Sequence, residues 1–146
     1  MNDVKSLGLQ TAQGMLLTEA FYWDLNDETR AWSKRFFEKT GKMPNMSQAG
    51  LYSATMHYLK AVQAAGTDDA KKVAAKMREM PVDDMYNKGV KIREDGRLLH
   101  DMRLVQVKAL GESKHKFDYY KILTTIPGEK AFRPPAESEC PLVKKG

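Results

Sequence analysis

Three consecutive aromatic residues, Phe21, Tyr22 and Trp23, are the side chains of this sequence that best suit a binding role. They follow the short apolar run 15–18, whose length favours a strand over a helix. Ligands of open α/β sheets usually lie where strands end, and flat aromatic faces stack on apolar or aromatic ligands. We therefore expect this aromatic corner to be a binding site. The alternative is a structural role, with Phe21 and Trp23 buried in the core and Tyr22 partly exposed.

Residue types that carry catalysis or bind metals are scattered along the chain. The histidines His57, His100 and His115 fall on different predicted elements, which argues against a zinc site, and His57 suits a surface or satisfied core histidine. The adjacent acids 83–84 and 94–95 lie in turn contexts, and turn formation accounts for them. No glycine-rich phosphate loop and no Ser-His-acid set stands out. These residues therefore predict no metal site and no cofactor, whereas spacing alone can never exclude a catalytic triad.

The helix that follows the corner is predicted from its cap and its spacing. Asn26 can accept a hydrogen bond from a free N–H of the first turn. Trp32 and Phe36 lie four residues apart and share one face. Gly41 can adopt the positive φ of a C′ residue, and Pro44 prevents continuation. Strand, corner and amphipathic helix together predict an α/β unit.

Two further helices are predicted between Pro44 and Pro81. The first has Ser47 as a plausible N-cap and ends at Gly66, and its apolar stripe has a spacing of three and four residues: Tyr52, Met56, Leu59 and Val62. The second starts at Thr67, and its apolar face consists of Ala70, Val73, Ala74 and Met77. Because the connection between them is short, the two helices must turn sharply and pack as neighbours.

Extended segments replace helices after Val82. Val90 and Ile92, the turn 94–97 and the run 102–107 are typical of paired strands, and 117–123 is a predicted last strand. The tail from Pro127 is proline-rich and extended. The expected order is one strand, three helices, a strand pair and a last strand. Such an order closes only a small sheet, with the first strand at an uncovered edge.

Composition places the chain among ordinary globular proteins. Its 146 residues indicate one domain, and 42% hydrophobic and 29% charged residues are typical values. The net charge of +5 comes from scattered Lys and Arg, so no nucleic-acid partner is predicted. No apolar run approaches a membrane span, and no secretory signal is found, so we expect either a cytoplasmic chain or a mature or truncated piece. The single Cys140 is either a free thiol or is bonded to a partner that this chain lacks.

Long collinear blocks resemble a known family. They are GMLLTEAFYWDLNDETRAWSKRFFEKTGKMP (14–44) and the segments 48–84, 91–108, 118–134 and 140–143. Residues 8–135 resemble the last two-fifths of a type I periplasmic substrate-binding protein, of the leucine/isoleucine/valine-binding branch of ABC importers and closest to its aromatic-acid-uptake relatives. The chain is therefore expected to be a single truncated segment, 1–146, with a tail at 136–146.

The resemblance implies two α/β lobes joined by a hinge, with ligand held between them. This chain would hold parts of both lobes, as three helices with a small mixed sheet in an incomplete two-lobe structure. The corner would lie near the hinge. Tyr52 would start the helix that faces the hinge, where it would bond ligand or brace the crossover, unless it packs in the core. The family's residues that bind the ligand's carboxylate and ammonium groups have no counterparts in the sequence.

From this resemblance we predict a binding protein that is not an enzyme: a C-terminal fragment of the solute-binding component of an ABC importer of branched-chain amino acids or aromatic carboxylates. The resemblance implies a periplasmic location, an ABC permease as partner and a small carboxylate-bearing solute. The candidate ligand-binding residues are Phe21, Tyr22, Trp23 and Tyr52. The alternative is a structural, self-associating fragment without ligand binding, for which an element-swapped homodimer is one form. A basic nucleic-acid adaptor is a third, less favoured class.

Overall fold

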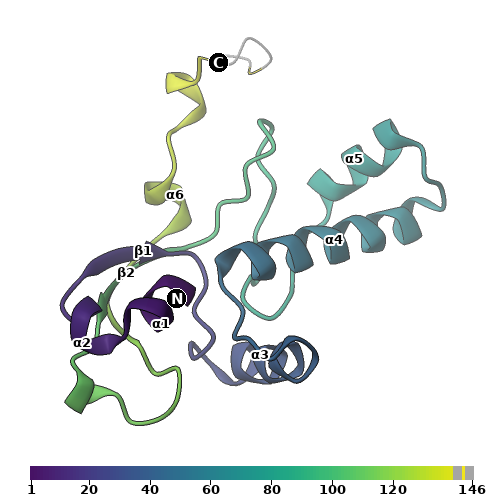
Figure 1. The fold of residues 1–146 in the computed structure, drawn as a ribbon. Helices are drawn as coiled ribbons and strands as arrows, with labels where there is room; N and C mark the ends of the chain where they lie inside the picture. Colours follow the sequence, from purple (N-terminus) through teal and green to yellow (C-terminus); the bar gives the residue numbers. More distant parts are fainter. Residues whose placement is uncertain (140–142, 144–146) are drawn as a thin grey trace. The chain divides into compact units, whose positions relative to one another are not determined.

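The structure is a computed structural model that describes residues 1–139 and 143. The ribbon of the chain is drawn in Figure 1. Its internal contacts divide the chain into two compact units. Unit 1 consists of Met1–Ala49 and Met102–Ile126, and unit 2 consists of Gly50–Asp101 and the described residues from Pro127 onward. Chain length alone indicated one domain and did not anticipate this division, because the polypeptide passes from one unit to the other three times.

Helices account for most of the regular structure. In chain order they are α1 (Asn2–Leu7), α2 (Leu9–Ala12), α3 (Asp27–Thr40), α4 (Met46–Ala65), α5 (Ala70–Glu79) and α6 (Gly128–Ala131), with single 3₁₀ turns η1 (Leu110–Glu112) and η2 (Pro135–Glu137). The three long helices α3, α4 and α5 are those that the sequence predicts. The short helices α1, α2 and α6 were not predicted, since each is too short to show a hydrophobic period.

Unit 1 contains a sheet of three strands, β1 (Leu16–Glu19), β2 (Met102–Val107) and β3 (Tyr120–Ile126), in the order β1-β2-β3. Together with the helices it confirms the predicted α/β class with a small sheet. Both strand pairs are antiparallel, so the expected mixed sheet was wrong in this detail. Each strand returns along its neighbour in the opposite direction, and the register shifts between Leu104 and Val105.

The core of unit 1 lies on one face of β2. Val105 and Val107 are 0% and 1% exposed. They pack in one cluster with Val4 and Ala12 from the two short N-terminal helices, and with Tyr120 from β3. The unpredicted helices α1 and α2 therefore cover this face of the sheet with apolar side chains.

The strand β1 lies at an edge of the described sheet, as the sequence predicts. It is less buried than its apolar run suggested, since Leu16 is 58% exposed and Leu17 only half-buried. Glu19, at the end of the strand, is buried instead. The short apolar run 15–18 predicts a buried strand, but its composition does not reveal what covers the two faces of that strand.

The helix α3 begins and ends as predicted. The Asn26 side chain accepts from the backbone N–H of Thr29 at 2.9 Å, and the Thr29 hydroxyl accepts from the backbone N–H of Asn26 at 3.0 Å. This reciprocal pair satisfies two donors that the first turn leaves free. Gly41 is left-handed at φ 69° and donates to the carbonyl of Phe37 at 2.8 Å. Trp32 is buried and Phe36 half-buried, which confirms the predicted inner face.

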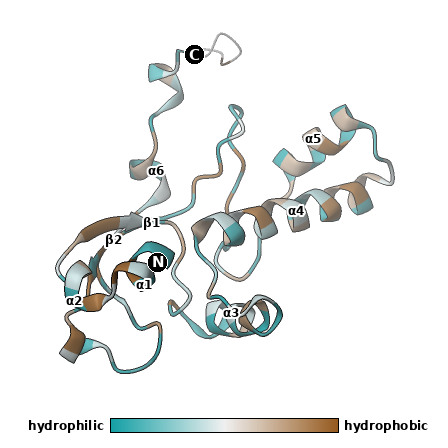
Figure 2. Ribbon diagram, viewed as in Figure 1, coloured by the Kyte–Doolittle hydropathy of each residue, from teal (hydrophilic) through white to brown (hydrophobic). Residues whose placement is uncertain are grey.

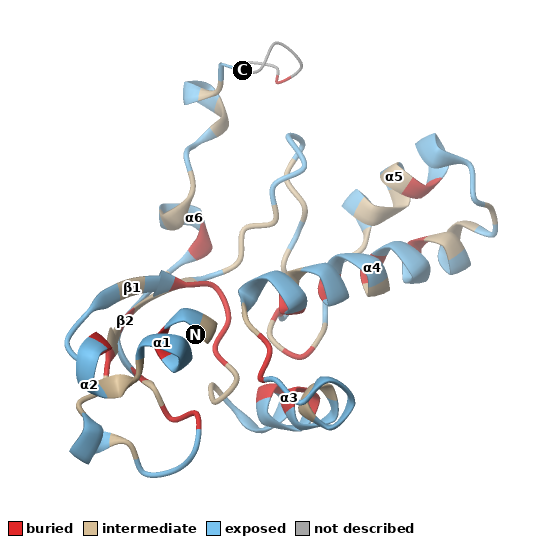
Figure 3. Cartoon of the chain, viewed as in Figure 1, coloured by how far each residue is buried: buried red, intermediate tan, exposed pale blue. Residues whose placement is uncertain are grey.

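The helix α4 turns a different face inward from the one predicted. Its buried positions are Ala49, Ser53, His57 and Ala61, whereas Tyr52 and Leu59 of the predicted stripe are exposed. Brown, hydrophobic bands run along α4 in Figure 2, and much of the same helix is exposed in Figure 3. Its start was also misplaced, because the side chain of Asn45, not that of Ser47, accepts from the first free N–H groups.

The rest of unit 2 consists of α5 and a loosely paired segment. The helix starts at Ala70 with Asp69 as its N-cap, three residues after the predicted Thr67. His57 of α4 bonds the carbonyl of Met77 at 2.8 Å, so α4 and α5 are neighbours and His57 is a satisfied core histidine, as predicted. The segment after α5 pairs only through the isolated bridges Val82↔Val90 and Ile92↔Leu98.

Two observations concern the limits of the chain. None of the described helices is long and apolar enough to cross a membrane. Cys140, for which the sequence left two roles open, lies outside the described residues.

Candidate functional site

The aromatic corner lies at the end of β1 in unit 1, and most of it is buried. Phe21 is 2% exposed and stands edge-on to the ring of Trp32 at 5.6 Å between centroids. Tyr22 is 3% exposed, and its ring lies 5.2 Å from that of Tyr120. Trp23 is half-buried. The structural alternative is right that Phe21 lies in the core, but it is wrong for the other two residues, since Tyr22 is buried and Trp23 is partly exposed.

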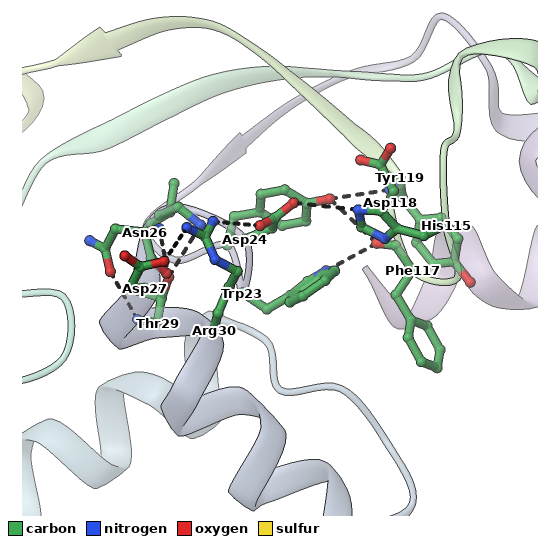
Figure 4. A network of polar contacts seen from close by, with 12 residues as sticks. Trp23, Asp24, Asn26, Asp27, Thr29, Arg30, His115, Phe117, Asp118 and Tyr119 are labelled. Atoms are coloured by element: carbon green, nitrogen blue, oxygen red, sulfur yellow. Dashed lines mark hydrogen bonds and ion pairs between the residues drawn. The ribbon is translucent and has the colours of Figure 1, made fainter.

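The polar atoms of Tyr22 and Trp23 converge on one backbone carbonyl. The indole Nε1 of Trp23 donates to the carbonyl of Phe117 at 3.0 Å (Figure 4). The Tyr22 hydroxyl donates to the same oxygen at 3.3 Å. The hydroxyl also accepts from the backbone N–H groups of Tyr119 and Tyr120 at 3.2 and 3.4 Å. Burial raises the pKa of Tyr22 to about 12, so its hydroxyl remains a neutral donor at physiological pH.

Phe117 has a strained backbone at the point where these bonds meet. Among the described residues other than glycine, it alone has a positive φ, 71°. A bulky residue adopts this conformation only where its surroundings impose it. The two side-chain hydrogen bonds to its carbonyl supply that constraint. Nothing in the sequence signals it, because position 117 is neither Gly nor Asn.

A group of charged residues surrounds the corner (Figure 4). Arg30 donates to Asp24 at 2.8 Å and to Asp27 at 2.7 Å. His115 stands edge-on to Trp23 at 5.7 Å between ring centroids, and its Nε2 lies 3.9 Å from Asp24. These contacts tie the 113–118 loop to the first turn of α3.

Asp118 is buried and held by two donors. Its carboxylate accepts from the Lys108 ammonium at 2.5 Å and from the backbone N–H of Lys114 at 3.0 Å. Burial alone would raise the pKa of Asp118, but these two hydrogen bonds and the nearby positive charge outweigh it and lower the pKa. Asp118 is therefore an ionised anchor of the loop.

Asp24, His115 and Asp118 offer ligand atoms that all lie within 4.8 Å of one another. The donor types suit a divalent cation, but Arg30 and Lys108 already neutralise both carboxylates. We therefore interpret the cluster as an ion-pair network. The scattering of the histidines over the sequence concealed it, although Asp118 follows His115 by three residues and that spacing was the available signal.

Tyr52 belongs to unit 2, on α4, and is 37% exposed. The exposure that ligand contact requires is therefore found at Trp23 and Tyr52 but not at Phe21 and Tyr22. The four residues do not form one cluster within a unit. Their role in binding ligand stays a prediction.

Unit 2 has its own polar network and cavity. Asp84 accepts from the backbone N–H groups of Tyr86 and Asn87 at 3.0 and 2.9 Å, as a turn-forming acid does, and its other oxygen accepts from Ser53 and Asn87. A cavity of about 310 Å³ lies nearby and is lined mainly by apolar side chains, among them Met77, Val82, Ile92 and Leu98. His57 and Tyr86 add its polar groups.

Comparison with protein families gives one match. The family described as periplasmic binding protein matches residues 1–115. A search of curated proteins found no match.

Solved structures give closer likenesses. A periplasmic binding protein from Burkholderia mallei is 49% identical with a TM-score of 0.94, and the match covers 98% of this chain and 38% of that protein. A branched chain amino acid ABC transporter periplasmic ligand-binding protein from Burkholderia xenovorans is 45% identical with a TM-score of 0.91, over the same shares of both chains. A leucine binding protein from Thermotoga maritima, 22% identical with a TM-score of 0.67 over 87% of this chain, shares the fold.

Proposed function

The chain belongs to the periplasmic binding protein family, and from this membership we propose that it forms part of the solute-binding component of an ABC importer. The observation that carries the proposal is the match of 98% of the chain to a periplasmic binding protein at a TM-score of 0.94. The matched family and the solved relatives are binding proteins and not enzymes. The recognition made from the sequence is thereby confirmed.

The chain spans 38% of the length of these two relatives, so the activity of the whole protein is part of the proposal. We propose a small carboxylate-bearing solute, either a branched-chain amino acid or an aromatic acid, and an ABC permease as the partner that receives it. The family location, the periplasm, is proposed for this chain as well. Solute would shift an equilibrium between open and closed forms through contacts made in the closed form.

A chimera tests this function. The part of the Burkholderia mallei relative that the chain does not match is joined to residues 1–146, and binding of leucine and of benzoate is measured by calorimetry. We expect the chimera to bind at least one of them at micromolar concentration, and the chain alone to bind weakly or not at all. Micromolar binding by the monomeric chain alone would contradict the proposal. So would a folded chimera that fails to bind the solutes that the full-length relative binds.

A second candidate function is self-association without ligand, and two observations favour it. The strand β1 lies at an edge of the described sheet with Leu16 58% exposed. On α4, Leu51 and Leu59 are 71% and 51% exposed. Uncovered edges and apolar faces promote association between chains. The mass of the chain in solution, measured by light scattering, tests this second function. A stable dimer that leucine and benzoate leave unchanged supports self-association, and a monomer contradicts it.

A further inference from the structure

A cavity of about 260 Å³ lies wholly within unit 1. It opens between α1, the segment that follows α3, and the turn that contains Phe117. Its lining includes Lys5, Ser6, Lys42, Met43, Phe117 and Tyr119. Small-molecule sites begin at roughly 300 Å³. The cavity therefore suits a ligand of about one ring.

The charged side chains that line this cavity all have the same sign. Lys5 and Lys42 line it, and no carboxylate does. The ammonium groups of Lys116 and Lys5 lie 5.1 and 5.8 Å from the centre of the Phe117 ring. Among the ion pairs of residues 1–139 and 143, none involves Lys5, Lys42 or Lys116. Lysines without a carboxylate partner beside a concave surface favour an anion.

The strained backbone of Phe117 fixes the aromatic wall of the cavity. Its φ of 71° sets the direction of the ring, and the bonds from Trp23 and Tyr22 hold its carbonyl. The ring stands edge-on to that of Phe37 at 5.6 Å and to that of Tyr119 at 6.2 Å. Strained residues persist where the surroundings over-determine them, and they cluster at binding sites. Trp23 and Tyr22 of the aromatic corner thus position the Phe117 ring in the cavity wall, although neither residue lines the cavity.

We propose that this cavity binds a small organic anion that carries one aromatic ring. Lys5 and Lys42 face its charge, and the rings of Phe117 and Tyr119 face its flat body. Trp23 is a positioning residue for Phe117. The site lies in unit 1 alone and goes beyond the solute clamp of the proposed function, on which it does not depend.

The test uses benzenesulfonate as a permanently charged probe and benzenesulfonamide as its neutral counterpart, titrated into residues 1–146. We expect saturable binding of the sulfonate at millimolar concentration and weaker binding of the sulfonamide. The double variant Lys5→Gln/Lys42→Gln should weaken binding of the sulfonate by about tenfold, as the loss of a charge-assisted hydrogen bond does. The matched control Lys71→Gln/Lys72→Gln, on exposed positions of α5, should bind as the parent does.

Further measurements separate the site from general charge attraction. The backbone amide signals of Phe117 and Tyr119 should shift on titration, and Trp23→Phe, which lacks the indole donor but keeps a ring, should weaken binding at unchanged net charge. The proposal is overturned by unsaturable binding, by equal affinity for the sulfonamide, by equal losses in the two lysine double variants, or by shifts confined to other residues.

Discussion

At the scale of single residues, the main feature is that several buried polar groups are satisfied by hydrogen bonds. The carbonyl of Phe117 collects hydrogen bonds from two aromatic side chains, and Asp118 collects them from an ammonium and an amide. In unit 2, the backbone N–H of the buried Gly128 donates to the Asp101 carboxylate at 3.1 Å. Each of these bonds satisfies a group whose burial alone would be costly.

Gly128 allows a prediction about close backbone approach. A Cβ at this position would clash with the Leu99 carbonyl and lie 2.9 Å from the carbonyl oxygen of His100. Backbone atoms cannot move aside cheaply, so we expect Gly128→Ala to reduce the free energy of unfolding by about 2–3 kcal/mol. Denaturant unfolding measures it. Gly111→Ala is the control, because nothing lies within 4 Å of its Cβ position and its φ is not positive. Equal effects of the two substitutions would contradict the prediction.

Glu19 allows a prediction about pH. It is 7% exposed, accepts from the Tyr120 hydroxyl at 3.3 Å and lies 3.7 Å from the Met1 ammonium. Burial raises its pKa above the ordinary 4.5, and the ammonium and the hydroxyl only partly offset this. Because the pKa is raised in the folded state, the contribution of Glu19 to the free energy of unfolding is fully present below pH 4.5. This contribution is lost as the pH rises through the folded-state pKa.

We therefore expect Glu19→Gln to stabilise the protein at pH 7 and to have little effect at pH 4, because glutamine resembles the protonated acid. Thermal unfolding of both proteins across this range measures the difference. The exposed Glu38→Gln on α3 is the control for the change in net charge. A Glu19→Gln variant less stable than its parent at pH 7 would show that the ion pair with Met1 outweighs burial.

At the scale of elements, helix ends were predicted better than helix faces. The cap and the C′ glycine of α3 depend on residues within the helix's own turns, so Asn26 and Gly41 identified them. The inner face of α4 could not be identified this way, because apolar residues lie almost all round it. The buried positions, Ala49, Ser53, His57 and Ala61, carry no large apolar side chain, so a hydrophobic period does not identify them.

The cap of α3 supports a second stability prediction. Asn26→Ala removes the acceptor for the Thr29 N–H and should reduce the free energy of unfolding by about 1 kcal/mol. Asn26→Ser keeps an acceptor at the N-cap and should recover most of the loss. Chemical denaturation followed by circular dichroism measures both variants. Indistinguishable Ala and Ser variants would indicate that the cap bond contributes nothing.

At the scale of the whole molecule, uncovered apolar surface is the dominant feature. Leu51, Tyr58 and Leu59 of α4 are 71%, 43% and 51% exposed, and Ile122 and Leu123 of β3 are 41% and 44% exposed. A helix that is apolar on all sides is normally buried. The chain spans 38% of the length of its two similar relatives, so surface of this kind is available to further polypeptide or to a second copy.

We expect residues 1–146 to self-associate through this surface. Leu51→Lys and Leu59→Lys should each weaken association by at least about tenfold, because burial of a leucine contributes roughly 1.5–3 kcal/mol. Light scattering over a range of concentrations measures the mass. Gln63→Lys, an exposed position on the same helix with the same charge change, should leave association unchanged. A parent protein that is monomeric throughout, or an equal effect of Gln63→Lys, would contradict this expectation.

The sequence by itself determined the α/β class, the three long helices and the turn-forming acids, because these depend on spacing and on bonds between near neighbours. It also determined the family, through the resemblance of its long collinear blocks. Tertiary structure alone decided which face of α4 is buried, that Tyr22 points inward, and that Phe117 adopts a positive φ. It also brought Asp24 to His115 and Asp118. Each of these depends on atoms contributed by distant segments, so local pattern cannot encode it.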